Sequence, residues 1–188
     1  MRNQKILTMV ECAVMIALAF ALSFVQIWKM PLGGSVTLAS MLPIMFIAIK
    51  HGTGTGLSCA FLYSLTQFAQ GLMEGTISTT SMSIDVFIIA SLFDYVVPFT
   101  LLGLSGVFRG LGNKGIYMGM TGAVLLRFIC HYLTGVTIWK QWTPAGWSSL
   151  VYSAAYNGGF LLPDFAICVA VAILLLQVKE IRRLIGLK

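Results

Sequence analysis

Polar, charged and aromatic side chains recur at spaced positions in a sequence that is otherwise almost wholly apolar. A charged group at the centre of a lipid bilayer costs about 2.5 kcal/mol or more, so a membrane protein keeps one where it has a partner, a cavity or a function. The chemistry open to these residues is ligand recognition by a carboxylate, an imidazole and flat rings. The candidates are Asp94, Tyr95, Arg127, His131, Trp139, Trp142, Trp147, Tyr152 and Asn157.

The composition indicates that membrane-spanning helices position these residues. Of the 188 residues, 58% are hydrophobic and only 10% are charged, which excludes a water-soluble domain. At about 20 residues per span, the length predicts a single all-α integral membrane domain, residues 1–188, with six transmembrane helices. Six spans of this length leave no room for a soluble ATPase domain in the 188 residues. The expected spans are 6–28, 36–49, 54–72, 84–108, 116–139 and 156–178, and the second is short and contains Pro43.

The basic residues predict the orientation, because lysine and arginine in short loops stay on the cytoplasmic side. Nine of the 12 lie before span one, between spans two and three, between spans four and five, or after span six, with Lys188 the last of them. The opposite loops contain Lys29 and Lys140, and Arg127 is inside span five. Both termini are therefore expected in the cytoplasm. Insertion and attraction to anionic lipid explain the net charge of +6 without a nucleic-acid partner.

Motifs for catalysis or metal binding do not occur in the sequence. The four cysteines fall inside expected spans without CxxC spacing, which is typical of small buried hydrophobic residues. There is no GxxxxGK[ST], HExxH or GxSxG motif. We expect no metal, no cofactor and no enzymatic activity in this chain.

Counting along the expected helices brings three ionisable residues to one depth. At 1.5 Å per residue, Asp94 lies about 15 Å below the outer surface, and His131 lies about 12 Å below Trp139. Arg127 is one helical turn deeper than His131, on nearly the same face. Two interpretations remain open: an Asp94–Arg127 ion pair that ties span four to span five, and a ligand site.

The aromatic residues also allow two interpretations. Trp28, Trp139, Trp142 and Trp147 lie where an interfacial aromatic belt is expected. Three of them share one outer connection, however, and with Tyr152 and Asn157 they can roof a cavity. Rings above one carboxylate and one imidazole suit a small heteroaromatic ligand, especially a cation.

Three stretches resemble thiamine-specific S components, the substrate-capture subunits of energy-coupling-factor (ECF) transporters. Spans five and six carry the likeness in LLRFICHYLTGVTIW, a tryptophan-rich loop and VYSAAYNGG, between Leu125 and Gly159. Span four resembles the family in FDYVVPFTLLGLSGVFRG, and the first outer loop does so in MPLGGSVTLASMLPI. The likeness covers nearly the whole chain in the same order.

The resemblance implies a six-helix subunit with the S-component fold in the bacterial cytoplasmic membrane. It would capture thiamine from outside and deliver it with a transmembrane scaffold subunit and two cytoplasmic ATPases, which use the ATP. By position, Asp94 would bind the aminopyrimidine, followed by Tyr95. His131 and Trp139 would contact the rings, and Tyr152 and Asn157 would close the outer end.

The first-loop side of the pocket departs from the family pattern. Some relatives have a tryptophan and a glutamate where this chain has Gly34 and Leu38. Polar contacts from Gln67, Tyr63 or Asp85 are candidate substitutes, and Arg127, Trp142 and Trp147 are candidate supports of the pocket. Asp85 has the alternative of simply solvating the end of its span.

Span one contains a stripe of small residues, Ala13, Ala17 and Ala21, at intervals of four. Such stripes let membrane helices approach closely. The resemblance assigns the stripe to the scaffold interface, and packing inside the chain is the alternative.

Other classes of function remain open from the sequence. An S component for another vitamin would share the architecture. A stand-alone secondary transporter is disfavoured because the six spans show no clear internal repeat and no second ionisable pair. A purely structural subunit is the remaining alternative. Free thiamine is preferred over its pyrophosphate, whose negative charge would lie near Asp94.

Overall fold

The computed structural model describes residues 2–186, so Lys188 of the orientation argument lies outside the described part. Two short strands, β1 (Gln26–Lys29) and β2 (Ser35–Thr37), follow the first helix. The α-helices are α1 (Arg2–Ser23), α2 (Leu42–His51), α3 (Thr53–Met73), α4 (Ile84–Ala90), α5 (Val97–Thr100), α6 (Gly112–Thr137), α7 (Ser149–Gln177) and α8 (Lys179–Leu184). A π-helix, η1 (Ser91–Val96), and 3₁₀ segments η2 (Leu101–Gly106), η3 (Arg109–Leu111) and η4 (Lys140–Trp142) complete the elements.

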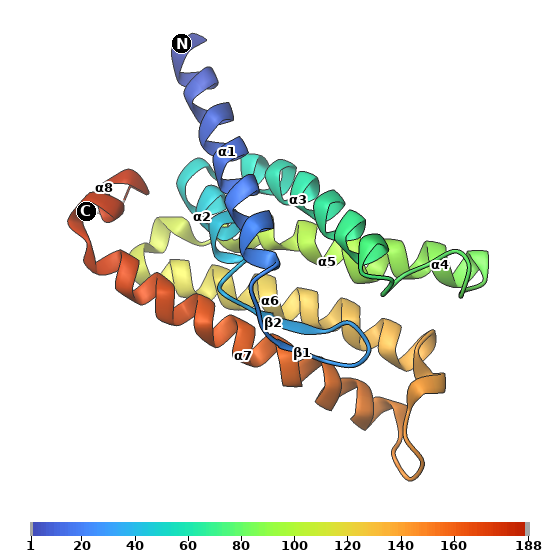
Figure 1. The fold of residues 1–188 in the computed structure, drawn as a ribbon. Coiled ribbons are helices and arrows are strands. Elements are labelled where there is room, and N and C mark those ends of the chain that lie inside the picture. Colours follow the sequence, from blue (N-terminus) through green and yellow to red (C-terminus); the bar gives the residue numbers. More distant parts are fainter. Residues whose placement is uncertain (1, 187–188) are drawn as a thin grey trace.

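The long helices form a bundle in which neighbours run in opposite directions. The stretch from α4 to η2 packs between α3 and α6, and α6 packs on α7 (Figure 1). Both chain ends lie at the end of the bundle where α2 joins α3, and the 138–148 connection lies at the other end (Figure 1). Within residues 2–186, three helical stretches are long and apolar enough to cross a membrane: Asn3–Ser23, Ile84–Thr137, which doubles back on itself, and Ser149–Gln177.

The expectation of an all-α chain was wrong at the connection between α1 and α2. The first expected span, 6–28, stops being helical at Ser23, and the second, 36–49, begins in a strand. The two strands pair antiparallel, with Trp28 opposite Val36. The turn closes with a 2.7 Å hydrogen bond from Met30 N–H to the Gly34 carbonyl, and Gly33 supplies a positive φ of 101°.

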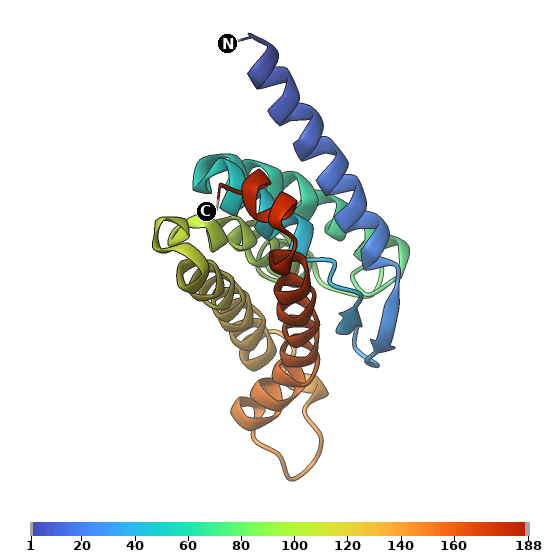
Figure 2. The same cartoon turned by 90° about the vertical axis from the view of Figure 1, so that its left-hand side faces the viewer.

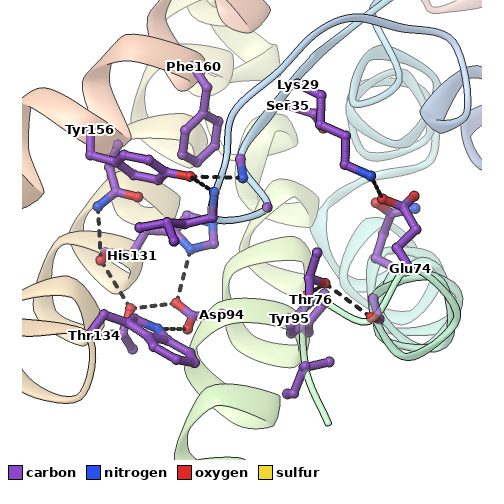
Figure 3. Close-up of a pocket in the computed structure, with 18 of the residues that line it drawn as sticks. Lys29, Ser35, Glu74, Thr76, Asp94, Tyr95, His131, Thr134, Tyr156 and Phe160 are labelled. Atoms are coloured by element: carbon purple, nitrogen blue, oxygen red, sulfur yellow. Dashed lines mark hydrogen bonds and ion pairs between the residues drawn. The ribbon is translucent and has the colours of Figure 1, made fainter. Parts of the chain in front are cut away.

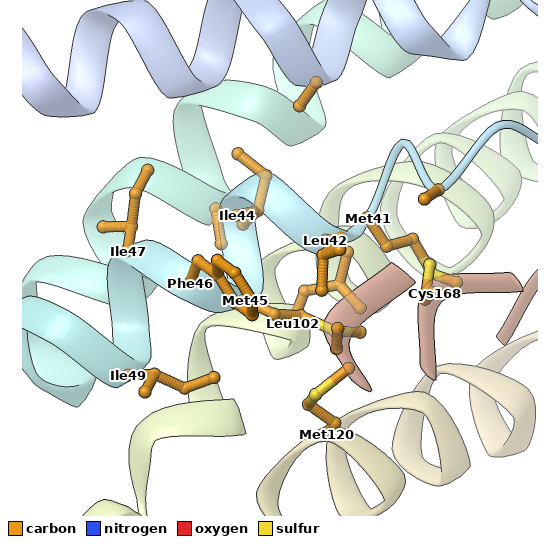
Figure 4. Packing of buried hydrophobic residues seen from close by; sticks show 14 of the residues in the cluster. Met41, Leu42, Ile44, Met45, Phe46, Ile47, Ile49, Leu102, Met120 and Cys168 are labelled. Atoms are coloured by element: carbon orange, nitrogen blue, oxygen red, sulfur yellow. The ribbon is translucent and has the colours of Figure 1, made fainter. Parts of the chain in front are cut away.

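Helix α2 is a core element rather than a full span. Its ten residues extend about 15 Å, half of the ~30 Å hydrocarbon thickness of a bilayer. Every residue from Leu42 to Ile49 is buried. Its side chains pack with residues of η2, α6 and α7, as Figure 4 shows for Met45, Leu102, Met120 and Cys168. The short apolar run therefore corresponds to a helix surrounded by the other helices.

Glycines let the helices around α2 approach closely. A Cβ on Gly103 would lie 2.5 Å from the Gly56 carbonyl carbon, and one on Gly106 would lie 2.1 Å from the Ala48 carbonyl oxygen. A larger residue at either position would separate α2 and α3 from η2. Small residues give membrane helices the close contact that stabilises them in the absence of a solvent-driven hydrophobic effect.

The span that carries Asp94 changes its helical type along its length. Pro98 lacks an N–H and cannot donate to the carbonyl of Asp94, four residues before it. The chain is a π-helix at Ser91–Val96 and a 3₁₀-helix at Leu101–Gly106, with one turn of α-helix between them. π-Helical turns often occur at functional sites. The irregular part of this span is the part that carries the candidate carboxylate.

The N-terminal part of α1 projects beyond the other helices, as both views of the fold show (Figures 1 and 2). Along the whole helix, Ala13, Ala17 and Ala21 are exposed, whereas Cys12 and Ala19 are buried against the bundle. The alanine stripe therefore faces outward, and packing inside the chain does not account for it.

Candidate functional site

A cavity of about 510 Å³ lies between the β1–β2 hairpin, the end of α3, η1, α6 and α7. Of the residues singled out from the sequence, those that line it are Gly34, Gln67, Asp94, Tyr95, Arg127, His131, Trp139, Trp142, Tyr152 and Asn157. Figure 3 shows Asp94 and His131 on one side of the cavity and Lys29 and Glu74 on the other. The fold thus gathers residues that are up to 123 positions apart in the printed sequence, from Gly34 to Asn157.

Asp94 is the centre of a hydrogen-bond network on the α6 side. Its Oδ1 accepts from Thr134 Oγ1 at 2.5 Å and lies 3.2 Å from His131 Nδ1. Its Oδ2 accepts from Trp139 Nε1 at 2.7 Å. A carboxylate offers about four acceptor positions, so these three bonds leave about one for a ligand. Carboxylate, imidazole and indole therefore form one connected wall.

The structure contradicts an ion pair between Asp94 and Arg127. Both residues are described, and the contacts of Asp94 are hydrogen bonds with His131, Thr134 and Trp139 instead. Arg127 directs Nε to His131 Nε2 at 3.3 Å and Nη1 to Met41 Sδ at 2.9 Å. Its guanidinium also lies 4.0 Å from the centre of the Phe99 ring, a cation–π contact. The aspartate is already occupied by donors nearer the C-terminal end of α6.

Helix α7 attaches the hairpin to the cavity. Tyr156 Oη accepts hydrogen bonds from the Leu32 and Gly34 N–H groups, at 3.2 and 3.3 Å. Asp164 Oδ1 accepts from the Thr37 N–H and hydroxyl, both at 2.8 Å. Asp164 is only 2% exposed, so these bonds are needed to satisfy its carboxylate.

The sequence interpretation did not include Asp164, Tyr156 or Thr134. A signal for Asp164 was available, because it lies seven residues after Asn157 and therefore on the same face of a helix, two turns away. Asn157 donates from Nδ2 to the His131 carbonyl at 3.2 Å and to the Ser153 carbonyl at 2.9 Å. It joins α7 to α6 beside the cavity.

The opposite wall holds a second polar network. Glu74 forms an ion pair with Lys29 at 2.5 Å and accepts from Gln70 Nε2 at 2.7 Å. Partial burial alone would raise the pKa of Glu74, but the hydrogen bonds from Lys29 and Gln70 outweigh it and leave the pKa below its usual 4.5. Gln67 donates to Gln70 at 3.1 Å. Glu74 thus ties strand β1 to the end of α3.

Tyr95 connects this wall to the π-helix. Its hydroxyl lies 2.7 Å from Thr76 Oγ1, in the connection after α3 (Figure 3). Gly71 makes room for the ring, because a Cβ there would lie 2.4 Å from the Tyr95 hydroxyl oxygen. Asp94 and Tyr95, adjacent in sequence, therefore form hydrogen bonds with different walls of one cavity.

Three other residues named from the sequence lie outside the cavity lining. Tyr63 is fully buried behind Phe99, with the two rings edge to face at 5.7 Å between centroids. Trp147 is 52% exposed and packs edge-on against Tyr152. Asp85 is exposed in the first turn of α4. Tyr63 and Trp147 therefore pack against residues that line the cavity. Asp85 is exposed to solvent, which agrees with the second interpretation given for it.

The cavity combines flat rings with three carboxylates, those of Glu74, Asp94 and Asp164. Such a lining suits a flat, positively charged ligand with hydrogen-bond donors, since ring faces and carboxylates both attract cations. The few polar groups amid aromatic walls are typical of a small-molecule site.

Comparisons with known proteins agree with this interpretation. The sequence model of the family described as "Thiamine transporter protein (Thia_YuaJ)" matches residues 9–184. The chain is 29% identical to the thiamine transporter ThiT of Bacillus subtilis (strain 168), over 93% of this chain and 92% of that protein. It is 21% identical to ThiT of Lacticaseibacillus paracasei, over 94% and 90% of the two chains.

A solved structure of ThiT from Listeria monocytogenes has the same fold. It superposes with a TM-score of 0.74 at 22% identity, over 97% of this chain and 99% of the other. Together with the match over nearly the full length, this establishes that the chain belongs to the thiamine transporter protein family.

Proposed function

We propose that this chain is the thiamine-binding S component of an ECF transporter and captures free thiamine from outside the cell. The observation that carries the proposal is the Asp94 carboxylate, which lies in the cavity between His131 and Trp139 with acceptor capacity left. Thiamine has an aminopyrimidine that donates hydrogen bonds and a thiazolium cation that stacks. The curated relatives carry the name thiamine transporter.

Each wall has a part in recognition under this proposal. Asp94 accepts a hydrogen bond from the aminopyrimidine, and His131 and Trp139 present ring faces to the ligand. Cation–π contact contributes from ~0.5 to about 2 kcal/mol per desolvated ring. Tyr152 and Asn157 close the outer end. A nanomolar site requires about −12 kcal/mol, so stacking, charge and burial must act together.

The proposed substrate is thiamine rather than its pyrophosphate. The cavity contains the carboxylates of Asp94 and Asp164, and Glu74 adds a third at the opposite wall. Lys29 is already paired with Glu74. Additional negative charge on the ligand would be repelled by the carboxylates of Asp94 and Asp164 in a site of low dielectric constant.

The proposed topology has six crossings and both termini in the cytoplasm. The excess of basic residues at one end of the bundle supports it, as does the placement of both chain ends there (Figure 1). The cavity then opens outward in the bacterial cytoplasmic membrane. The short α2 completes the second crossing together with the extended residues before it.

Coupling to ATP hydrolysis is proposed to occur through partner chains. The exposed Ala13, Ala17 and Ala21 on α1 form a smooth strip suited to close contact with a transmembrane scaffold subunit. Two cytoplasmic ATPases bound to that scaffold would use the ATP. This chain would then bind and release substrate without catalysing a reaction.

Tryptophan fluorescence of the purified chain in detergent tests the proposal. Two of the four tryptophans, Trp139 and Trp142, line the cavity and can report on a bound ligand. We expect saturable quenching by thiamine at nanomolar concentration, without any ATPase, and none by riboflavin or biotin. Quenching by one of the other vitamins would change the substrate, and no response to thiamine would refute the proposal.

A further inference from the structure

His131 lies between a group that can only donate hydrogen bonds and a group that accepts them. On one side, Arg127 Nε–H points at its Nε2 over 3.3 Å. On the other, Asp94 Oδ1 lies 3.2 Å from its Nδ1. Arg127 and His131 are each only 8% exposed, so water does not easily replace either partner.

The arginine determines where the imidazole proton resides. A guanidinium stays protonated in proteins and has no acceptor, so the nitrogen that receives its N–H must present a lone pair. Nε2 of His131 is therefore unprotonated, and the single ring proton is on Nδ1, where it is donated to Asp94. An imidazolium would place an N–H against the N–H of Arg127.

We propose that Arg127 is a positioning residue that holds His131 in the neutral Nδ1–H form and so keeps its ring a suitable surface for a cationic ligand at all physiological pH values. The identity of that ligand rests on the proposed function. The tautomer and the charge of the ring follow from the geometry alone.

The charges around this pair favour the same arrangement. Arg127 is already a buried cation, and a second one on His131 would be separated from it by a single hydrogen bond. The titratable groups that surround the pair from the adjacent helices and from α6 itself are Asp94, Asp164, Cys168, Tyr63 and Cys130. A bound thiazolium would add positive charge here, so a neutral ring is the state compatible with ligand binding.

Arg127 is held by contacts that do not involve the histidine. Nη1 contacts Met41 Sδ at 2.9 Å, and the guanidinium lies on the Phe99 ring. These contacts hold the guanidinium of Arg127 so that its Nε points toward the next turn of α6. That turn carries His131, four residues after Arg127. Met41 therefore offers a matched control: its substitution alters the surroundings of Arg127 without removing the donor to His131.

Nitrogen-15 NMR of histidine-labelled protein tests the proposal without any ligand. The sequence contains two histidines, His51 and His131, and a His51→Gln variant assigns the signals. We expect the His131 nitrogens to show the neutral Nδ1–H tautomer unchanged from about pH 5.5 to 8, the range in which an ordinary histidine titrates. A neutral Nε2–H tautomer, or an imidazolium within this range, would overturn the proposal.

The pH dependence of thiamine binding provides the second test. In Arg127→Met, Nε2 loses its permanent donor and can take up a proton beside Asp94, so we expect thiamine to bind about tenfold more weakly at pH 5.5 than at pH 8. Wild type and Met41→Leu should change less than about threefold over the same range. A flat profile in Arg127→Met would contradict the proposal.

The two tests separate the failure of this inference from that of the proposed function. If wild type binds no thiamine at any pH, the function is refuted, and the NMR result still decides the tautomer. If Arg127→Met does not fold, the wild-type NMR spectrum again decides. If wild type binds thiamine but His131 titrates as an ordinary histidine, the function stands and the positioning role of Arg127 fails.

Discussion

Replacing Asp94 with asparagine should weaken thiamine binding while leaving the fold in place. Asparagine has the same shape, but it loses the charge and exchanges one carboxylate oxygen for an NH₂ donor. Three donors now converge on this side chain, from His131, Thr134 and Trp139. The asparagine amide can satisfy two of them through its oxygen, and its NH₂ must face either the third donor or the ligand.

The magnitude follows from the bond that the ligand would lose. A hydrogen bond to a charged group contributes about 1.5–3 kcal/mol. Each 1.4 kcal/mol corresponds to about tenfold in Kd, so Asp94→Asn should bind thiamine roughly 10- to 150-fold more weakly. The wall itself loses charge-assisted bonds as well, so a lower melting temperature is expected alongside.

Fluorescence titration of Asp94→Asn and of Asp85→Asn, side by side, provides the assay. Asp85 is a matched control because it is a carboxylate in the same span but exposed outside the cavity lining. Its substitution should leave the Kd within about twofold, as expected for a surface change. Equal affinities of the Asp94 variant and wild type, with both folded, would refute the assignment of Asp94 as the ligand carboxylate.

Three further variants test other parts of the molecule. Ala13→Trp with Ala17→Trp should abolish uptake in cells but leave thiamine binding intact, since both alanines are exposed; lost binding would contradict the interface. Gly34→Ala places a Cβ 2.5 Å from Phe160 Cδ1, so overpacking should destabilise the fold by about 1–3 kcal/mol and, because Phe160 lines the cavity, weaken binding in the same titration. Glu74→Gln should cost about 0.2–1 kcal/mol in thermal unfolding at pH 7. The pKa of Glu74 is lowered in the fold, so the difference from wild type should persist above pH 4.5 and vanish as the pH falls through that lowered value.

Controls for these variants come from neighbouring positions. Gly110→Ala adds a Cβ with no heavy atom within 4 Å and should leave affinity unchanged, which distinguishes contact with Phe160 from a general effect of glycine replacement. For Glu74, a difference that grows rather than shrinks in acid would show that the carboxylate is not stabilised by its ion pair with Lys29.

The level at which the candidate residues meet could be predicted from the sequence because regular helices convert residue number into depth. Counting placed Asp94 and His131 at one level, and the structure brings them within 3.2 Å. Trp139, eight residues after His131, also reaches Asp94 from the end of α6. Each of these relations depends on helical rise and on adjacent spans being antiparallel, which short connections ensure.

Other parts of the fold depend on contacts that spacing does not encode. Hydrophobic Ile27 and Trp28 continue the apolar pattern of α1, so the strand that contains them was read as helix. Of the two interpretations open for Arg127, the ion pair with Asp94 was wrong, because it considered charge alone, whereas Asp94 binds the side chains of His131, Thr134 and Trp139. Asp164 accepts a hydrogen bond from Thr37, which lies 127 residues earlier in the chain, and no local sequence pattern relates the two.

The π-helix at Ser91–Val96 departs from the regular α-helix that the sequence pattern predicts, and this departure lies at the candidate site. Regular α-helix would satisfy every carbonyl of this span, but Pro98 removes the donor for Asp94 and the backbone widens at Ser91–Val96. The adjacent Asp94 and Tyr95 in this segment reach opposite networks, Asp94 toward Trp139 and Tyr95 toward Thr76. Departures from local consistency are expected at functional sites, and this one coincides with the carboxylate on which the proposed recognition of thiamine depends.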